Sequence, residues 1–191
     1  DTVLERDGQR IVLIDTAGIR KRGKVEPGIE KYSVLRAVRA IDRADVVFLL
    51  VDAADGVTAQ DTHIAGYVAE AMKGLIIVVN KWDLVRAEAA IHRKPEKDAS
   101  GKTLPDYREE YENTVRRQFN FVAYAPILFI SAKTGQRLPQ VLDMALQVKA
   151  ERQHRVSTGV LNTAVQEAIL RHNPPSDHGR QLKVLYATQV G

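Results

Sequence analysis

Asn80, Lys81 and Asp83 form a polar cluster directly after a continuously apolar run of the chain. A fixed carboxylate at Asp83 can accept two hydrogen bonds from neighbouring N–H donors on one edge of a planar base. Guanine offers this pair at N1 and N2, whereas adenine would leave the carboxylate unpaired at a cost of roughly 1–3 kcal/mol or more. The Lys81 stem can lie over the ring while its ammonium group stays solvated. The spacing predicts a guanine-binding loop; the alternative is a helix cap at Asp83 with Lys81 on the surface.

Two further loops also follow apolar runs. Asp15 and Gly18 come after residues 11–14, and Ser131 comes at the end of the run over residues 127–130. A carboxylate at Asp15 can hold Mg²⁺ through water, and the Gly18 N–H can approach a terminal phosphate. The Asp15 and Gly18 motif alone is weak evidence, because Asp and Gly commonly end strands. Their shared placement after apolar runs predicts one site.

The elements that must position these loops alternate between strand and helix. The pattern predicts a hairpin over residues 2–6 and 9–14 with a turn at 7–8, and a strand buried on both faces at 11–14. It then predicts a helix lined by Val34, Val38 and Ile41, a strand at 46–51, a helix from a capping box at Thr58 to Lys73, and a strand at 75–79. An irregular excursion at 86–106, a helix at 107–119, a strand at 127–130 and a helix at 138–151 complete this part. A helix capped by Ser157 or Thr158 and a strand at 182–187 follow.

Such alternation is typical of an α/β fold, a doubly wound parallel sheet with helices on both faces. Ligands bind such sheets at the carboxyl ends of the strands, where all three loops lie. Trp82 is predicted to be a packing residue rather than a base stacker.

Composition limits the other possibilities. The 191 residues are 45% apolar and 27% charged, and they include no cysteine, which excludes disulfide frameworks and thiol catalysis. The longest apolar runs are too short to span a bilayer, and no signal peptide opens the chain. We therefore expect a cytoplasmic protein with no membrane partner. The net charge of +4 favours an anionic partner only mildly.

The three loops read Asp-x-x-Gly, Asn-Lys-x-Asp and Ser-Ala-Lys, and in this order they resemble the third to fifth signature motifs of translation-factor-class P-loop GTPases. Residues 15–24, 30–33 and 80–84 resemble the second GTPase domain of the bacterial EngA/Der family. Residues 155–162 and 182–191 are similar to the opening of that family's C-terminal KH-like domain. The resemblance implies a Ras-like GTPase domain over residues 1–152 and a truncated KH-like α+β domain over 153–191.

The resemblance also implies a function, which is GTP hydrolysis to GDP and phosphate in the biogenesis of the large ribosomal subunit, with nucleotide state controlling association with ribosomal RNA. It implies a preceding GTPase domain in the same polypeptide, Mg²⁺ held through water at Asp15, and K⁺ with ligands outside this chain. No catalytic residue is assigned, because Ile19 stands where Ras-type enzymes place a water-orienting Gln. The residues assigned to the nucleotide are Asp15, Thr16, Ala17, Gly18, Ile19, Asn80, Lys81, Asp83, Ser131, Ala132 and Lys133.

One departure from the family is the lack of a usable P-loop, the Gly-x-x-x-x-Gly-Lys-Ser/Thr cradle for phosphates. The resemblance places the P-loop strand between the strands at 11–14 and 46–51, which would otherwise lie roughly 9–10 Å apart with unpaired backbone groups. We therefore expect a fragment of a longer polypeptide. The alternative is a non-catalytic RNA- or protein-binding module that retains guanine-recognition loops.

Overall fold

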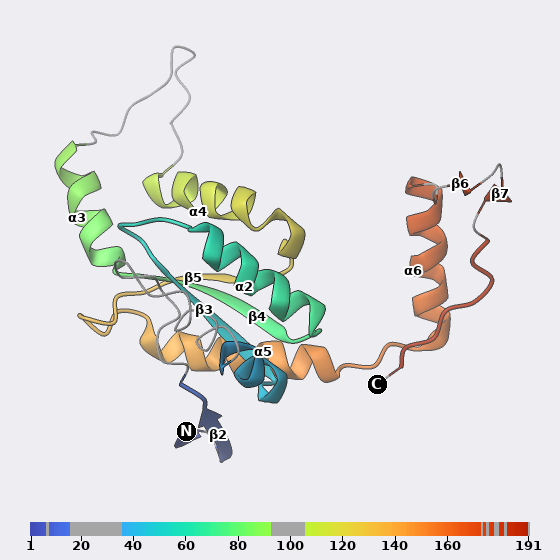
Figure 1. Cartoon of the computed structure of the whole chain (residues 1–191), viewed down its shortest axis with the longest axis horizontal. Helices are drawn as coiled ribbons and strands as arrows, with labels where there is room; N and C mark the ends of the chain where they lie inside the picture. The colour runs from blue at the N-terminus through green and yellow to red at the C-terminus, as the bar shows by residue number, and fades with distance from the viewer. Residues whose placement is uncertain are drawn as a thin grey trace, which may run out of the picture. The chain divides into compact units, whose positions relative to one another are not determined.

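The computed structural model describes residues 1–6, 8–15, 36–92, 106–172, 174, 176–177, 180–181 and 183–190 (Figure 1). The chain forms two compact units, Asp1–Lys149 and Ala150–Gly191. Within the described ranges, no helix has the length and apolar character needed to cross a membrane.

A parallel three-stranded sheet is the centre of the first unit. Its strands are β3 (Val46–Asp52), β4 (Gly74–Asn80) and β5 (Ile127–Phe129), in the order β3-β4-β5. The register pairs Asp52 with Asn80 and Val79 with Phe129, so all three strands end at one edge. Strand β4 has six buried residues before Asn80, as expected for a strand covered on both faces.

Helices cover both faces of this sheet, which confirms the predicted doubly wound architecture. One face packs against α2 (Ala59–Glu70), the start of α3 (Trp82–His92), α4 (Tyr107–Gln118) and the helix whose described part is 36–43. The other face, formed by Ile76, Val78 and Ile130, packs against α5 (Leu138–Gln153) (Figure 1).

Two predicted helix boundaries are wrong. The capping box at Thr58 and Asp61 is confirmed, but α2 ends at Glu70 because Met72 adopts a left-handed φ of 53° and Gly74 already pairs in β4. The predicted excursion at 86–106 begins too early, since α3 continues to His92. Its sequence after Val85 is rich in good helix formers, Arg, Ala and Glu. Residues 93–105 lie outside the described part of the chain.

The N-terminal hairpin is confirmed. Strands β1 (Thr2–Arg6) and β2 (Gln9–Leu13) pair antiparallel, and Gly8 supplies the positive φ of 73° that the turn requires. The prediction that the second run is buried on both faces is wrong, because β2 pairs only with β1 among the described strands and Val12 is 47% exposed.

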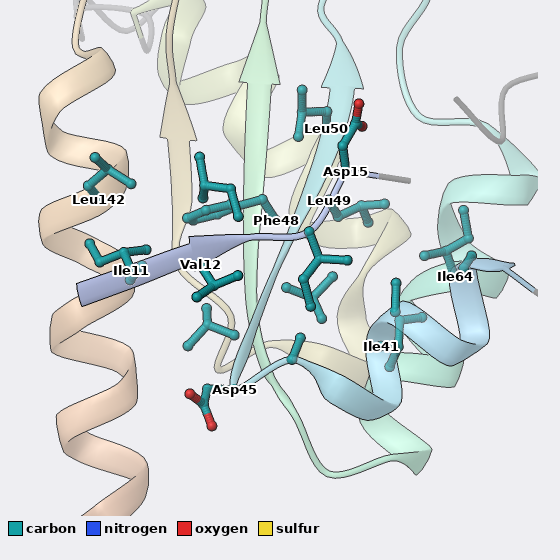
Figure 2. Close-up of a pocket in the computed structure, with 18 of the residues that line it drawn as sticks. Ile11, Val12, Asp15, Ile41, Asp45, Phe48, Leu49, Leu50, Ile64 and Leu142 are labelled. Carbon is teal, nitrogen blue, oxygen red and sulfur yellow. The ribbon is translucent and has the colours of Figure 1, made fainter. Parts of the chain in front are cut away.

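A groove of about 880 Å³ lies between β2 and β3, and we call it the β2–β3 groove (Figure 2). Every residue of β2 and of β3 lines it, together with apolar side chains such as Ile41, Ile64 and Leu142. Among the described residues, these two strands are not hydrogen-bonded to each other. The outer edge of β3 is therefore open along its length among the described residues.

The second unit contains α6 (Thr158–Arg171), and the predicted cap at Ser157 is confirmed by its contact with the Val160 N–H. Two short strands follow, β6 (Ser176–Asp177) and β7 (Arg180–Gln181). The strand predicted at 182–187 is wrong, because residues 183–187 make no strand ladder. Instead the Asn162 side chain exchanges two hydrogen bonds of 2.9 Å with the Ala187 backbone.

Whether the β2–β3 groove is open can be tested with two neighbouring leucines of β3 that line it. Leu49 is 5% exposed and Leu50 is 60% exposed. We expect Leu49→Ala to lower the free energy of unfolding by about 2–5 kcal/mol, because it leaves a cavity in the core. Leu50→Ala should cost less than about 1 kcal/mol in urea denaturation of this chain. Equal losses in the free energy of unfolding for the two variants would show that the Leu50 side chain is buried as well and that the groove is filled.

Candidate functional site

The carboxyl ends of the three parallel strands form one rim. The Ala53 N–H donates to the Asn80 backbone carbonyl at 2.8 Å, which joins the ends of β3 and β4. The Ile130 N–H donates to the Val79 carbonyl at 2.9 Å, which joins the ends of β4 and β5. The loops that leave these strands therefore begin side by side, and two of them, after β4 and β5, are loops that the sequence analysis placed at one site.

The Asn80 side chain connects two of the predicted loops. Its Oδ1 accepts hydrogen bonds from the Lys81 N–H at 2.8 Å and from the Ala132 N–H at 3.0 Å. Ala132, predicted to contact the nucleotide, thus uses its N–H to hold Asn80 in this structure. Asn80 is consequently fixed by two loops at once.

Asp83 lies in the first turn of α3. Its Oδ1 is buried and accepts no hydrogen bond from any described residue. The alternative role as a helix cap is not what the structure shows, since α3 already begins at Trp82. A buried, unpaired carboxylate oxygen carries a large desolvation penalty. A partner that presents N–H donors to the Asp83 carboxylate, as the guanine edge does, would offset this penalty.

Lys81 reaches back across the rim to β3. Its Nζ lies 2.6 Å from Oδ2 of Asp52, whose side chain is only 8% exposed. The sequence analysis did not select Asp52. A signal was present, since Asp52 directly follows the apolar run at 46–51, as the other site residues follow apolar runs.

The third loop is closed by its own backbone. Ser131 is completely buried, its N–H donates to the Gln136 carbonyl at 3.2 Å, and its Oγ accepts from the Thr134 N–H at 3.2 Å. Ser131 therefore shapes the loop, whereas Lys133 is exposed.

Asp15 lines the β2–β3 groove together with Asp52, Asn80 and Lys81, and its carboxylate lies near the Leu50 end of β3 in Figure 2. In the described ranges, no three His, Cys, Asp or Glu side chains gather closely enough to hold a metal ion. A single carboxylate fits Mg²⁺ that keeps several waters and shares phosphate ligands. The predicted residues Thr16, Ala17, Gly18 and Ile19 lie outside the described residues.

An aromatic cluster supports the rim from behind. Trp82 packs against Tyr107, Tyr111 and Phe129 with ring centroids 6.1, 5.3 and 4.6 Å away, so its predicted packing role is confirmed. The Tyr111 hydroxyl donates to the Ala53 carbonyl at 2.8 Å and so ties α4 to the end of β3. Burial, with smaller contributions from Tyr107 and Asp52, raises the pKa of Tyr111 above 10.0.

Comparison with known proteins identifies this architecture. Residues 2–151 match the family model described as the elongation factor Tu GTP binding domain. The chain belongs to this family. Residues 155–191 match the model of the KH-domain-like C-terminal part of EngA bacterial GTPase enzymes. The GTP-binding domain is therefore followed by a KH-like segment, and the resemblance to the EngA/Der family is confirmed.

Curated relatives named GTPase Der align over nearly the whole chain. The protein of Desulfitobacterium hafniense strain DSM 10664 is 48% identical over 191 residues, and that of Caldanaerobacter subterraneus is 49% identical over 191 residues. That of Chloroflexus aggregans is 50% identical over 190 residues, which are 99% of this chain and 39% of the relative. For the first two, the chain spans 40% of the relative's length.

Solved structures of similar fold are more distant in sequence. Era in complex with MgGDPNP and a segment of 16S ribosomal RNA has a TM-score of 0.56 at 20% identity, over 76% of this chain and 42% of that one. A probable GTP-binding protein engB has a TM-score of 0.54 at 18% identity, over 78% and 83%. These likenesses support the GTPase fold alone.

The contact of Tyr111 at the rim predicts a pH dependence of stability. A raised folded-state pKa means that the neutral hydroxyl stabilises the fold, fully below pH 10 and progressively less as pH rises through the folded pKa. Tyr111→Phe should lower the free energy of unfolding by about 1 kcal/mol at neutral pH. The difference from the parent chain should shrink above pH 10 in urea denaturation.

Tyr124, which is 66% exposed, provides the matched control. Tyr124→Phe should leave the free energy of unfolding equal to that of the parent chain, both at neutral pH and above pH 10. If the gap between parent and Tyr111→Phe were constant from neutral to alkaline pH, Tyr111 would not stabilise the rim as a neutral donor.

Proposed function

We propose that the rim binds guanine nucleotide and that the chain works as part of a GTPase in biogenesis of the large ribosomal subunit. The relatives are named as GTPases, and the chain spans about two fifths of their length. The observation that carries the proposal is the buried Oδ1 of Asp83, which accepts no hydrogen bond from any described residue. Asp83 comes three residues after Asn80, whose side chain joins the loops after β4 and β5.

Each rim residue has a chemical role in this proposal. Asp83 accepts from guanine N1 and N2, and the Lys81 stem covers one face of the base. Asn80 holds the Lys81 and Ala132 backbones in place through the two hydrogen bonds it accepts. Ser131 closes the third loop, with Lys133 exposed beside it.

The phosphates are assigned to the segment that begins at Asp15. Asp15 would hold Mg²⁺ through water, and the Gly18 N–H would donate to the terminal phosphate. Thr16, Ala17 and Ile19 are assigned to the nucleotide with them. Bound Mg²⁺ would neutralise charge that develops on the phosphates during transfer. Because Ile19 cannot orient water, we assign no catalytic residue in this chain and propose K⁺ activation with ligands outside it.

The proposed biological setting is the bacterial cytoplasm. Residues 1–152 form the GTPase part and residues 153–191 begin the KH-like domain, after an earlier GTPase domain in the same polypeptide. Nucleotide state would control association with the large subunit and its RNA. The match to the EngA C-terminal model supports this setting.

Substitution of Asp83 tests the base site. In Asp83→Asn, an amide N–H replaces one acceptor oxygen, so xanthine, with a carbonyl at C2, becomes the better partner. We expect affinity for GDP to fall about 10- to 100-fold, and affinity for xanthosine diphosphate to rise. Fluorescent-nucleotide competition on the complete protein measures both.

Asp106→Asn is the matched control, because Asp106 is exposed at the start of α4 and its side chain makes no cap hydrogen bond. It should preserve the preference for guanine. Unchanged base preference in Asp83→Asn would instead favour the non-catalytic binding module.

A further inference from the structure

An ion pair joins the ends of two neighbouring strands at the rim. Nζ of Lys81, after β4, lies 2.6 Å from Oδ2 of Asp52, the last residue of β3. The two partners differ in environment, since the Lys81 side chain is 47% exposed and that of Asp52 is 8% exposed. The carboxylate is thus the fixed partner and the ammonium group the mobile one that it restrains.

Asp52 is itself held by the turn that follows β3. Its Oδ1 accepts the Ala54 N–H at 3.0 Å, and its backbone carbonyl accepts the Gly56 N–H at 2.9 Å. The Ala53 backbone between them is bonded on both sides, to Asn80 and to Tyr111. A carboxylate anchored in this way has little freedom to follow a moving lysine.

The Lys81 backbone is fixed as well. Its φ of 64° lies in the left-handed region, which costs a non-glycine residue energy and persists only where the surroundings impose it. Here the Lys81 N–H donates to Asn80 Oδ1, and the next N–H, that of Trp82, donates to the Ile130 carbonyl. Both ends of the side chain are therefore held, the backbone by β4 and β5 and the ammonium group by β3.

We propose that Asp52 is a positioning residue for the base site and acts through Lys81. By holding Nζ over the end of β3, Asp52 keeps the Lys81 stem extended along the rim before any ligand binds. This inference rests on the proposed guanine site. The gain is pre-organisation, because the four-carbon stem does not lose its conformational freedom at the moment of binding.

Two substitutions separate the charge of Asp52 from its structural contact. Asp52→Asn keeps an Oδ1 acceptor for the Ala54 N–H and removes the charge facing Lys81. Lys81→Met removes the ammonium group and keeps an apolar stem. Asp45→Asn is the matched control, since Asp45 pairs with Lys149 at 3.1 Å just before the opposite end of β3.

The first measurement needs no nucleotide. Limited acetylation of this chain, read by mass spectrometry, reports how freely the Lys81 amine reacts. We expect Asp52→Asn to raise the acetylation rate of the Lys81 amine about two- to fivefold, since the ion pair no longer restrains this amine. Asp45→Asn should leave the Lys81 rate unchanged. Equal Lys81 rates in the parent chain and Asp52→Asn would overturn the proposal.

The second measurement is a double-mutant cycle for GDP affinity in the complete protein. Asp52→Asn should weaken GDP binding about three- to tenfold when Lys81 is present. In the Lys81→Met background, Asp52→Asn should change GDP affinity by less than about twofold, because the ammonium group that Asp52 holds is absent. An equal loss in both backgrounds would show that Asp52 acts independently of Lys81 and would overturn the proposal.

Failure of the guanine site itself gives a different pattern. If the complete parent protein bound no guanine nucleotide, the proposed function would fall, and the acetylation rates would still decide whether Asp52 restrains Lys81. If the parent bound GDP and both measurements showed no effect of Asp52→Asn, only the positioning role would fall.

Discussion

The side-chain oxygen of Asn80 is the contact on which the rim depends. It accepts two backbone N–H groups from different loops, while the Asn80 backbone carbonyl accepts a third from the end of β3. Three strand ends thus converge on one residue. This is possible because parallel pairing sets the register, Asp52 beside Asn80 and Val79 beside Phe129. The distances at the rim therefore follow from the register of a buried apolar sheet.

The helices and aromatic side chains packed behind the rim stabilise this register. Strand β4 is buried between both layers of helices, and the Trp82 ring fills the space between Phe129 and α4. Trp82 and Asp83 are consecutive, so the same turn of α3 carries one side chain in the core and the other at the proposed base site. Apolar burial stabilises the sheet, and this rigid core holds the polar contacts at the edge of the sheet in place.

Local pattern predicted much of this arrangement. Continuous apolar runs identify buried strands, and polar residues at their ends identify the rim, so Asn80 and Asp83 could be selected from spacing alone. The Asp52–Lys81 pair could not, because it depends on which strands are neighbours. The strand expected at 182–187 failed for a similar reason, since a strand needs a partner and this segment hydrogen-bonds to α6 side chains. The exposure of Val12 likewise depends on what lies beside β2 rather than on its sequence.

In the part of the chain that the structure describes, no strand pairs with the outer edge of β3, and this has a consequence for how the protein reaches its native state. An uncovered strand edge is a template for pairing with any extended chain, including another copy of the same protein. The sequence Val46 to Val51 contains no lysine, proline or bulge that would discourage such pairing. Apolar side chains of the β2–β3 groove add to the attraction. Productive folding and aggregation therefore compete for the same backbone groups.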